Sequence, residues 1–130
     1  PQKFVMDARA LTFPNDHFGT VTAFFSMMYM KTREDHQQVM KEAFRVLKPG
    51  GRMYLWDIDL STQNKPRKIA YMVPVRYQVG QCIKGTCYGV KWPDQTRDEA
   101  YYIELARETG FKHHETERIG QQAFKFTFTK

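Results

Sequence analysis

Features that mark several protein classes are scarce in this chain of 130 residues. Its two cysteines, Cys82 and Cys87, are spaced neither as a Cys-x-x-Cys redox pair nor as a zinc knuckle. No apolar run approaches the roughly 18 residues of a membrane span, and the sequence from Pro1 onward lacks the pattern of a signal peptide. We therefore expect one folded domain with reduced cysteines in the cytoplasm, without a membrane span or a metal site.

Acidic residues are fewer than basic ones, and the net charge is +6. The basic residues are spread along the whole chain, with the densest group at residues 65–68. A scattered excess permits an anionic partner such as RNA or membrane lipid, but it is more typical of an ordinary solvated surface. We do not expect nucleic acid to be the partner.

The clearest pattern lies in residues 45–57, and it predicts a helix that ends abruptly and is followed directly by a strand. Pro49 cannot continue a helix, and Gly50 and Gly51 permit the tight backbone that a short connection needs. Residues 53–56 then form a short apolar run, which is typical of a buried strand.

Apolar periodicity predicts the other elements. We expect one helix over residues 33–47, with Thr32 and Asp35 at its start. A second helix should begin at a capping box of Thr96 and Glu99 and run to about residue 109, with Gly110 at its end. His36 is assigned to the outward side of the first helix. The predicted strands are residues 3–6, 18–25, 52–58, 112–119 and 123–129.

An ordered set of short motifs resembles a known family. Asp7-Ala8 is followed by Leu and Phe-Pro within residues 11–14, by Phe18 and Val21, and by Arg-Val-Leu-Lys-Pro-Gly-Gly at residues 45–51. This set is similar to the second half of class I S-adenosylmethionine-dependent methyltransferases, including those of ubiquinone and menaquinone biosynthesis. Gly19 departs from the family, which commonly has Asp there, and the likeness is weakest over residues 61–93.

The resemblance implies a fold and a set of cofactor contacts. The fold is α/β, a Rossmann-like sheet whose strands correspond to family strands 3, 4, 5, 7 and 6, with flanking helices. S-adenosylmethionine is the implied cofactor. Asp7 and Ala8 would contact its adenine, and Phe24 and Phe25 would face its methionine end. Asp7 could instead only cap the following turn.

Candidates for the acceptor pocket are fewer and less specific. Met27 lies in a Met-rich run that could equally belong to the core. Asp57 ends a strand and is a possible base or substrate contact, and Tyr71 lies in residues 61–93, which we expect to form an irregular hairpin or a lid that covers the site. No catalytic residue can be assigned, because methyl transfer from a sulfonium needs mainly positioning and a dry pocket.

Part of the family pattern is absent. The glycine-rich loop and the ribose-binding carboxylate are not found, so residues 1–130 look like a partial methyltransferase domain that is catalytically incomplete. In the family the sheet order is 3-2-1-4-5-7-6, so the strand at residues 18–25 would carry an open edge, which allows a homodimer. The favoured function is methyl transfer to a small-molecule acceptor. A non-catalytic domain that self-associates or binds a partner, and an RNA or protein methyltransferase, are the alternatives.

Overall fold

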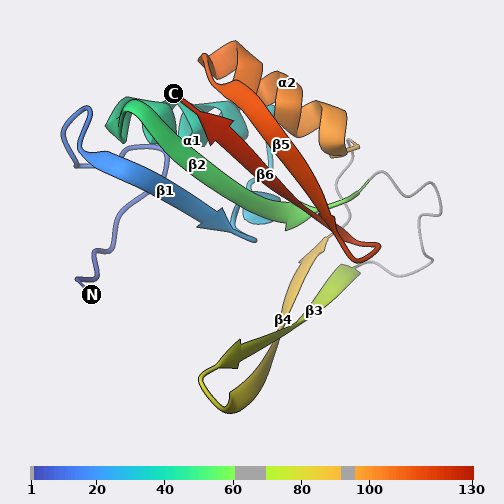
Figure 1. Cartoon of the computed structure of the whole chain (residues 1–130). Helices are drawn as coiled ribbons and strands as arrows, with labels where there is room; N and C mark the ends of the chain where they lie inside the picture. Colours follow the sequence, from blue (N-terminus) through green and yellow to red (C-terminus); the bar gives the residue numbers. More distant parts are fainter. Residues whose placement is uncertain (1, 61–69, 92–95) are drawn as a thin grey trace.

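The computed structural model describes residues 2–60, 70–91 and 96–130, and it contains a four-stranded sheet, a separate β-hairpin and two α-helices (Figure 1). The sheet has the order β1-β2-β6-β5. In chain order the elements are β1 (Phe18–Phe24), the 3-10 helix η1 (Met27–Tyr29), α1 (Arg33–Val46), β2 (Leu47–Ile58), β3 (Ala70–Val79), β4 (Cys82–Lys91), α2 (Glu99–Thr109), β5 (Lys112–Ile119) and β6 (Ala123–Thr129).

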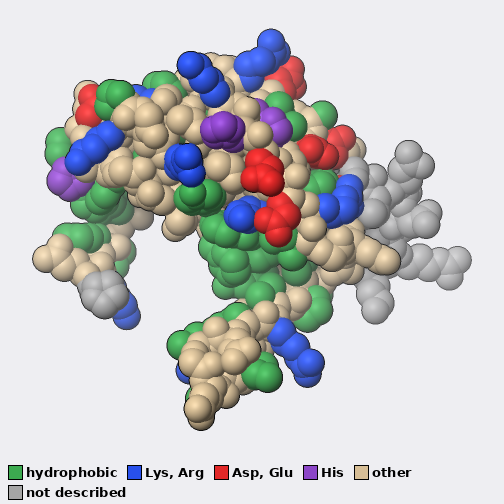
Figure 2. Space-filling model, viewed as in Figure 1, with side chains coloured by type: hydrophobic (Ala, Val, Ile, Leu, Met, Phe, Trp, Pro, Cys, Tyr) green, Lys and Arg blue, Asp and Glu red, His purple; other side chains and the backbone are tan. Residues whose placement is uncertain are grey.

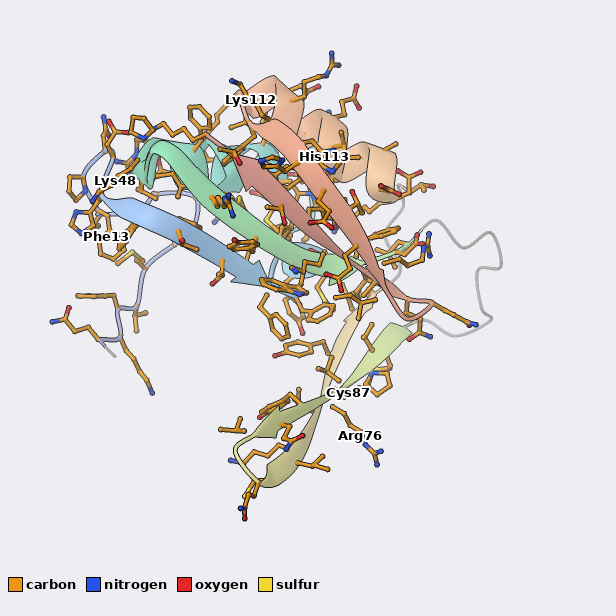
Figure 3. The ribbon with its side chains drawn as sticks, viewed as in Figure 1. Phe13, Lys48, Arg76, Cys87, Lys112 and His113 are labelled. Atoms are coloured by element: carbon orange, nitrogen blue, oxygen red, sulfur yellow. The ribbon has the colours of Figure 1, made fainter. Side chains whose placement is uncertain are left out.

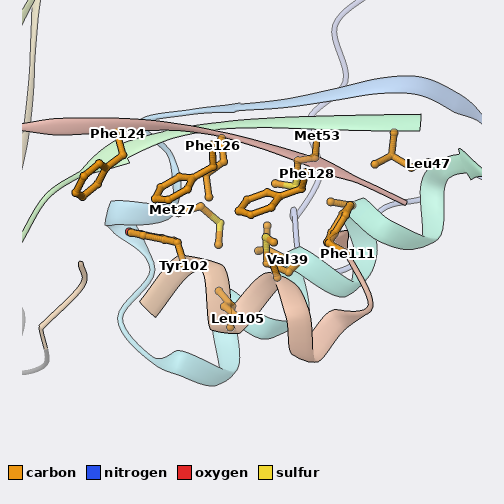
Figure 4. Close-up of a cluster of buried hydrophobic side chains, with 14 residues drawn as sticks. Met27, Val39, Leu47, Met53, Tyr102, Leu105, Phe111, Phe124, Phe126 and Phe128 are labelled. Carbon is orange, nitrogen blue, oxygen red and sulfur yellow. The ribbon is translucent and has the colours of Figure 1, made fainter. Parts of the chain in front are cut away.

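The sheet combines one parallel pair with two antiparallel pairs. β1 runs parallel to β2, which pairs antiparallel with β6, and β6 pairs antiparallel with β5. This order matches family strands 4, 5, 7 and 6, so the expected Rossmann-like α/β class is confirmed. Both α1 and α2 lie on the same side of the sheet (Figure 4).

The main core lies between that side of the sheet and the two helices. On β6 the residues Phe124, Phe126 and Phe128 alternate with partly exposed ones, so all three rings point to the helices. They meet the apolar faces of both helices (Figure 4). The buried cluster consists of Met27, Val39, Met40, Ala43, Leu47, Met53, Leu55, Tyr102, Leu105, Ala106, Phe111, Phe124, Phe126 and Phe128.

The chain passes directly from α1 into β2, so the expected change from helix to strand within residues 45–51 is present, but the strand begins at Leu47 and not at residue 52 as predicted. Gly50 has a φ of 75°, which favours glycine, and its N–H donates to the carbonyl of Lys130 at 3.0 Å. A Cβ on Gly51 would lie 2.8 Å from the carbonyl oxygen of Lys48. Arg45 leaves α1 toward the N-terminal segment, where its guanidinium donates to the carbonyls of Leu11 and Phe13. The motif therefore fixes a tight connection and holds the preceding chain in place.

The three expectations about helix ends have different outcomes. Thr32 caps α1 as predicted, since its side chain accepts from the Asp35 N–H at 3.1 Å. For α2, the predicted cap at Thr96 is wrong, because Asp98 is the N-cap and its carboxylate accepts from the Tyr101 N–H at 2.9 Å. Gly110 ends α2 in the left-handed conformation, as predicted.

The predicted strand at residues 3–6 is not formed. Phe4 and Val5 are 60% and 107% exposed, and no strand of the described sheet lies beside them. A short extended segment gains neither ladder hydrogen bonds nor burial without a neighbouring strand, which accounts for the difference. The open edge expected on β1 is present, since β1 pairs only with β2 in the part of the sheet that the structure describes.

The hairpin of β3 and β4 projects from the body of the molecule (Figure 1). It is a regular ribbon, in contrast to the irregular one expected, and its register runs from Ala70 opposite Lys91 to Val79 opposite Cys82. Its base covers a second buried cluster, on the face of the sheet away from the helices, which consists of Phe25, Met28, Ile58, Leu60, Val73 and Ala123. Residues 61–69 and 92–95 of the expected lid lie outside the described residues. No described helix is long and apolar enough to cross a membrane.

Candidate functional site

The parallel strands β1 and β2 end side by side, with Phe24 opposite Trp56. In open α/β sheets, ligands bind beyond the carboxyl ends of the parallel strands. Here the chain leaves β1 through Phe25, which has a φ of 47° although it is not glycine, and its N–H donates to the Trp56 carbonyl at 2.9 Å. A positive φ is uncommon for a bulky residue and is strained, so the surrounding structure must enforce it. Strain of this kind is found most often at functional sites. This turn is the first element of the candidate site.

A hollow of about 560 Å³ lies at this turn, between the sheet and the base of the hairpin. Figure 2 shows hydrophobic side chains gathered there, above the projecting hairpin. The volume falls within the range of small-molecule sites. The residues that line the hollow are Phe24, Phe25, Trp56, Val73, Pro74, Val75, Arg76, Tyr77, Ile119, Gly120, Gln121, Gln122 and Ala123.

The rings at the floor of the hollow pack against one another. The Phe24 and Trp56 centroids are 5.6 Å apart, and Phe25 stacks on Tyr88 of β4 at 5.2 Å. Phe24 remains 46% exposed, so a face of this aromatic group is open to a ligand. Arg76 is the one charged side chain among the described residues that line the hollow. The site therefore suits an apolar or planar ligand. The part of the ligand that lies next to Arg76 should not be positively charged, because it would be repelled by the guanidinium.

Asp7 lies apart from the hollow, on the N-terminal segment. Its two carboxylate oxygens accept from Arg9, at 3.1 Å from Nε to Oδ1 and 2.8 Å from Nη2 to Oδ2, and Arg9 also donates to Asp35 at 2.7 Å. The hydrogen bonds from Arg9 lower the pKa of Asp7 to about 2, so the carboxylate is ionised. Arg9 thus ties the Asp7 turn to the first turn of α1. Because Arg9 uses both oxygens, an adenine amino group could bind Asp7 only by sharing or displacing Arg9.

Asp57, near the end of β2, is fully buried and does not line the hollow. Its Oδ1 accepts from the Ile58 N–H at 2.7 Å. Among the described residues, neither its Oδ2 nor the Tyr102 hydroxyl has a partner at hydrogen-bond distance. The nearby Tyr102 hydroxyl nevertheless lowers the pKa of Asp57. Burial raises the pKa of Asp57 to about 7. A sealed carboxyl group cannot reach an acceptor, so the geometry does not support a role as base.

His36 is buried, and its assignment to the surface was wrong. Its Nε2 lies 2.8 Å from the Met27 carbonyl, which can only accept, so Nε2 carries the proton and Nδ1 accepts from the Tyr101 hydroxyl at 2.6 Å. Burial lowers the pKa of His36 to about 4. His36 lies one helical turn from the buried Met40, a spacing in the sequence that could have revealed its position.

Arg97 supports the same connection between β1 and α1. Its guanidinium is buried and donates to the carbonyls of Met30 at 2.8 Å and Lys31 at 3.2 Å. Together with His36, it occupies carbonyls of the chain that follows Phe25. No sequence motif pointed to Arg97, because its role depends on the distant packing of α2 against this connection.

The residues predicted for the site fall into separate groups. Phe24 and Phe25 line the hollow, whereas Asp7 and Ala8 lie away from it, and Ala8 packs against the main core. Met27 is 1% exposed in that core and does not line the hollow. Tyr71 belongs to β3, and its side chain lies outside the described residues. Trp56, Arg76 and Tyr88 are contributors that sequence reasoning missed.

Comparison with known proteins identifies relatives of the chain. Residues 1–55 match the family described as "Methyltransferase domain". The ubiquinone/menaquinone biosynthesis C-methyltransferase UbiE of Pseudomonas savastanoi is 38% identical over 65 residues, which are 50% of this chain and 24% of the relative. The enzyme of the same description from Roseobacter denitrificans is 30% identical over 113 residues, 82% of this chain and 44% of the relative. The chain thus spans less than half the length of these relatives.

Solved structures agree on the fold. An S-adenosylmethionine-dependent methyltransferase from Clostridium acetobutylicum superposes with a TM-score of 0.69 at 11% identity, covering 99% of this chain and 64% of that one. At this identity the likeness bears on the fold alone. The motifs, the matched domain of residues 1–55, the curated relatives and the sheet order agree, and together they support the class I S-adenosylmethionine-dependent methyltransferases as the family that this chain resembles.

Proposed function

We propose that the protein transfers a methyl group from S-adenosylmethionine to a small-molecule acceptor, and that this chain supplies the rim of the site at the end of β1. S-adenosylmethionine is the cofactor expected of the family. The names of the relatives, C-methyltransferases of ubiquinone and menaquinone biosynthesis, make carbon the favoured site of methylation.

The observation that carries the proposal is the turn at Phe25. Its left-handed backbone and the open aromatic hollow beside it stand where an α/β sheet of this kind presents its ligands. Phe24, Phe25 and Trp56 offer apolar ring surface and exclude water from one wall. A dry, shaped wall is what an in-line displacement at a sulfonium requires of a protein.

The residues present fit the cofactor in three respects. When bound, S-adenosylmethionine supplies an activated methyl group on a positively charged sulfur. Phe24 keeps an exposed ring face that can lie against such a cation, and Asp7 is an ionised acceptor for an amino group. Ala8, next to Asp7, would offer its backbone N–H to the adenine ring. The cofactor contacts proposed for this chain are therefore Asp7, Ala8, Phe24 and Phe25.

Calorimetric titration with S-adenosylhomocysteine tests the proposal. We expect saturable binding to the chain, weakened at least tenfold in Asp7→Ala through loss of a charge-assisted hydrogen bond. Glu115→Ala is the matched control, because it removes an exposed carboxylate from β5. Arg9→Gln frees the Asp7 carboxylate and should preserve or strengthen binding. Equal affinities in Asp7→Ala and Glu115→Ala would remove Asp7 from the site.

A second candidate is a non-catalytic domain that associates through the edge of β1. It is favoured by the unpaired edge of β1 in the described sheet, because such edges are ready to pair with another strand. Sedimentation over a range of concentrations tests it. A dimer that is lost when Thr22, at the exposed edge, is changed to Pro would support a homodimer built on β1.

Nothing in the described residues favours an RNA or protein substrate, since Arg76 is the one basic residue that lines the hollow. The segment at residues 61–93 remains our proposal for a substrate-covering part of a partial domain. Cytoplasmic location also remains a proposal, supported by the two exposed and unpaired cysteines.

A further inference from the structure

The outer half of the β3–β4 hairpin exposes apolar side chains on both of its faces. Val79 is 62% exposed and Ile83 is 73% exposed. Val79 pairs with Cys82, and Ile83 with Gln78, so the two apolar side chains belong to neighbouring rungs and point to opposite faces of the ribbon. A surface built to dock into a protein groove is apolar on one face. A tip that is apolar on both faces is better matched by a lipid layer, which can contact both faces at once.

The charge of the hairpin has one sign. Residues 70–91 contain Arg76, Lys84 and Lys91, and no Asp or Glu. Figure 3 shows Arg76 projecting from the outer part of the ribbon. Arg76 pairs with Gly85, three rungs behind the rung of Val79 and Cys82. At the usual rise per residue, Arg76 therefore stands about 10 Å behind the tip.

The polar groups at the turn are partly satisfied within the hairpin. The side-chain amide of Gln78 donates to the carbonyl of Gly80 at 2.8 Å. A turn that meets its own hydrogen-bonding needs loses less when it leaves bulk water. In the part of the chain that the structure describes, β3 and β4 pair only with each other, so their outer edges carry unpaired backbone groups. Such groups are not tolerated in the hydrocarbon interior, so any contact with a bilayer must be shallow.

We propose that the hairpin tip is a docking element for an anionic lipid surface. Val79, Ile83 and the half-exposed Tyr77 enter the boundary between headgroups and acyl chains, while Arg76 and Lys84 contact the anionic headgroups. The tip-to-cation distance matches the depth of roughly 5–10 Å to which interfacial elements are buried. This inference does not depend on the proposed catalytic function, although Arg76 and Tyr77 also line the hollow.

The two natural cysteines provide a matched pair of reporters. Cys82 lies at the tip, and Cys87 lies five residues farther back on the same strand and is also exposed. An environment-sensitive fluorophore is attached to Cys82 in the Cys87→Ser variant, and to Cys87 in the Cys82→Ser variant. The labelled chains are mixed with vesicles in which about a third of the lipid is phosphatidylglycerol, or with phosphatidylcholine alone. We expect a blue shift at Cys82 with the anionic vesicles and little change at Cys87.

Flotation of the unlabelled chain measures the affinity. Changing Arg76 and Lys84 to Gln should lower binding to anionic vesicles about 30-fold. Changing Lys48 and Lys112 to Gln removes the same charge at the end of the sheet far from the hairpin (Figure 3) and should have a much smaller effect. Val79→Thr combined with Ile83→Thr keeps the β-branched shape and should weaken binding about tenfold.

Each alternative has its own signature. Equal responses from the two labels, no flotation with anionic vesicles, or equal losses in both pairs of Gln variants would overturn the proposal. A shift at Cys82 that grows with protein concentration in the absence of lipid would assign the tip to a second copy of the chain. A shift produced by S-adenosylhomocysteine alone would make the hairpin a ligand-operated lid. Either result would also refute lipid docking. Circular dichroism of every variant verifies that the body remains folded.

Discussion

The two faces of the sheet are used in different ways. The helix side holds fourteen buried residues in one cluster, which includes the three phenylalanines of β6. The hairpin side holds a smaller cluster of six, next to the hollow of about 560 Å³ and the exposed ring of Phe24. The helix side therefore contributes more to stability, and we propose that the hairpin side provides the surface for ligands and partners. Perturbing one side at a time tests this division.

The largest expected effect comes from the helix side. Phe126 is fully buried in the middle of that cluster, and Phe126→Ala should lower the free energy of unfolding by about 3–5 kcal/mol. Val73→Ala on the hairpin side should cost about 2 kcal/mol at most, and it should increase proteolysis of the hairpin more than it changes the global transition. Urea denaturation and limited proteolysis measure the two effects. Similar global losses in both variants would contradict the division between the faces.

The second effect is a pair of opposed pH dependences on the helix side. His36 has its pKa lowered from 6.5 to about 4, so the unfolded chain binds more protons between these values and stability rises with pH. Asp57 has its pKa raised from 3.8 to about 7, so the folded chain binds more protons and stability falls as pH rises. Over about pH 4.5 to 6.5 the two should nearly cancel, each being on the order of 3 kcal/mol in total.

Single variants separate the two contributions. His36→Gln should reveal a stability that falls with rising pH, and Asp57→Asn one that rises with pH. Urea denaturation at several pH values measures both. Below about pH 4.5 the carboxylates of Asp7, Asp35 and Glu42, whose pKa values are lowered by their arginine partners, add a loss of stability in acid. A steep slope in the unaltered chain, or the same slope in both variants, would show that the two groups do not oppose each other.

A third, smaller effect concerns the connection that begins β2. Gly51→Ala places a Cβ 2.8 Å from the Lys48 carbonyl oxygen and 3.1 Å from that of Gly19. Because both neighbours are backbone atoms, we expect a loss of about 1–3 kcal/mol. Gly19→Ala is the control, since nothing lies within 4 Å of its Cβ. Thermal denaturation should separate the two, and equal midpoints would mean that the break in residues 45–51 is less tightly packed than described.

The smallest expected effect tests the start of α2. Asp98→Ala removes the side chain that accepts from the Tyr101 N–H and should cost about 1 kcal/mol. Thr96→Ala should change the free energy of unfolding by only a few tenths of a kcal/mol. Chemical denaturation of the two variants decides between the caps, and a greater loss in Thr96→Ala would restore the capping box that the sequence suggested.

Local signals in the sequence predicted most of the body. Pro49 with the two glycines marked the change from α1 to β2, and the alternation of Phe124, Phe126 and Phe128 marked the buried face of β6. Gly110 marked the end of α2. These features depend on residues close in sequence, and periodicity is sufficient to find them.

The differences depend on neighbours that are distant in sequence. Residues 3–6 have the composition of a strand but no partner in the described sheet, and pairing cannot be predicted from composition. The hollow brings Phe24 of β1 to the hairpin and to Gln121 of the β5–β6 turn, which only the tertiary fold can do. Several glycines in the hairpin obscured its register, because each could have been the turn.

The most direct test of the central claim is to locate the cofactor on the chain. Ultraviolet cross-linking of radiolabelled S-adenosylmethionine, followed by tryptic mapping, should place the label on residues 10–31, which contain Phe24 and Phe25, or on residues 4–9, which contain Asp7 and Ala8. Excess S-adenosylhomocysteine should abolish the labelling. Label confined to other peptides, or undiminished by that competitor, would contradict a cofactor site at the end of β1.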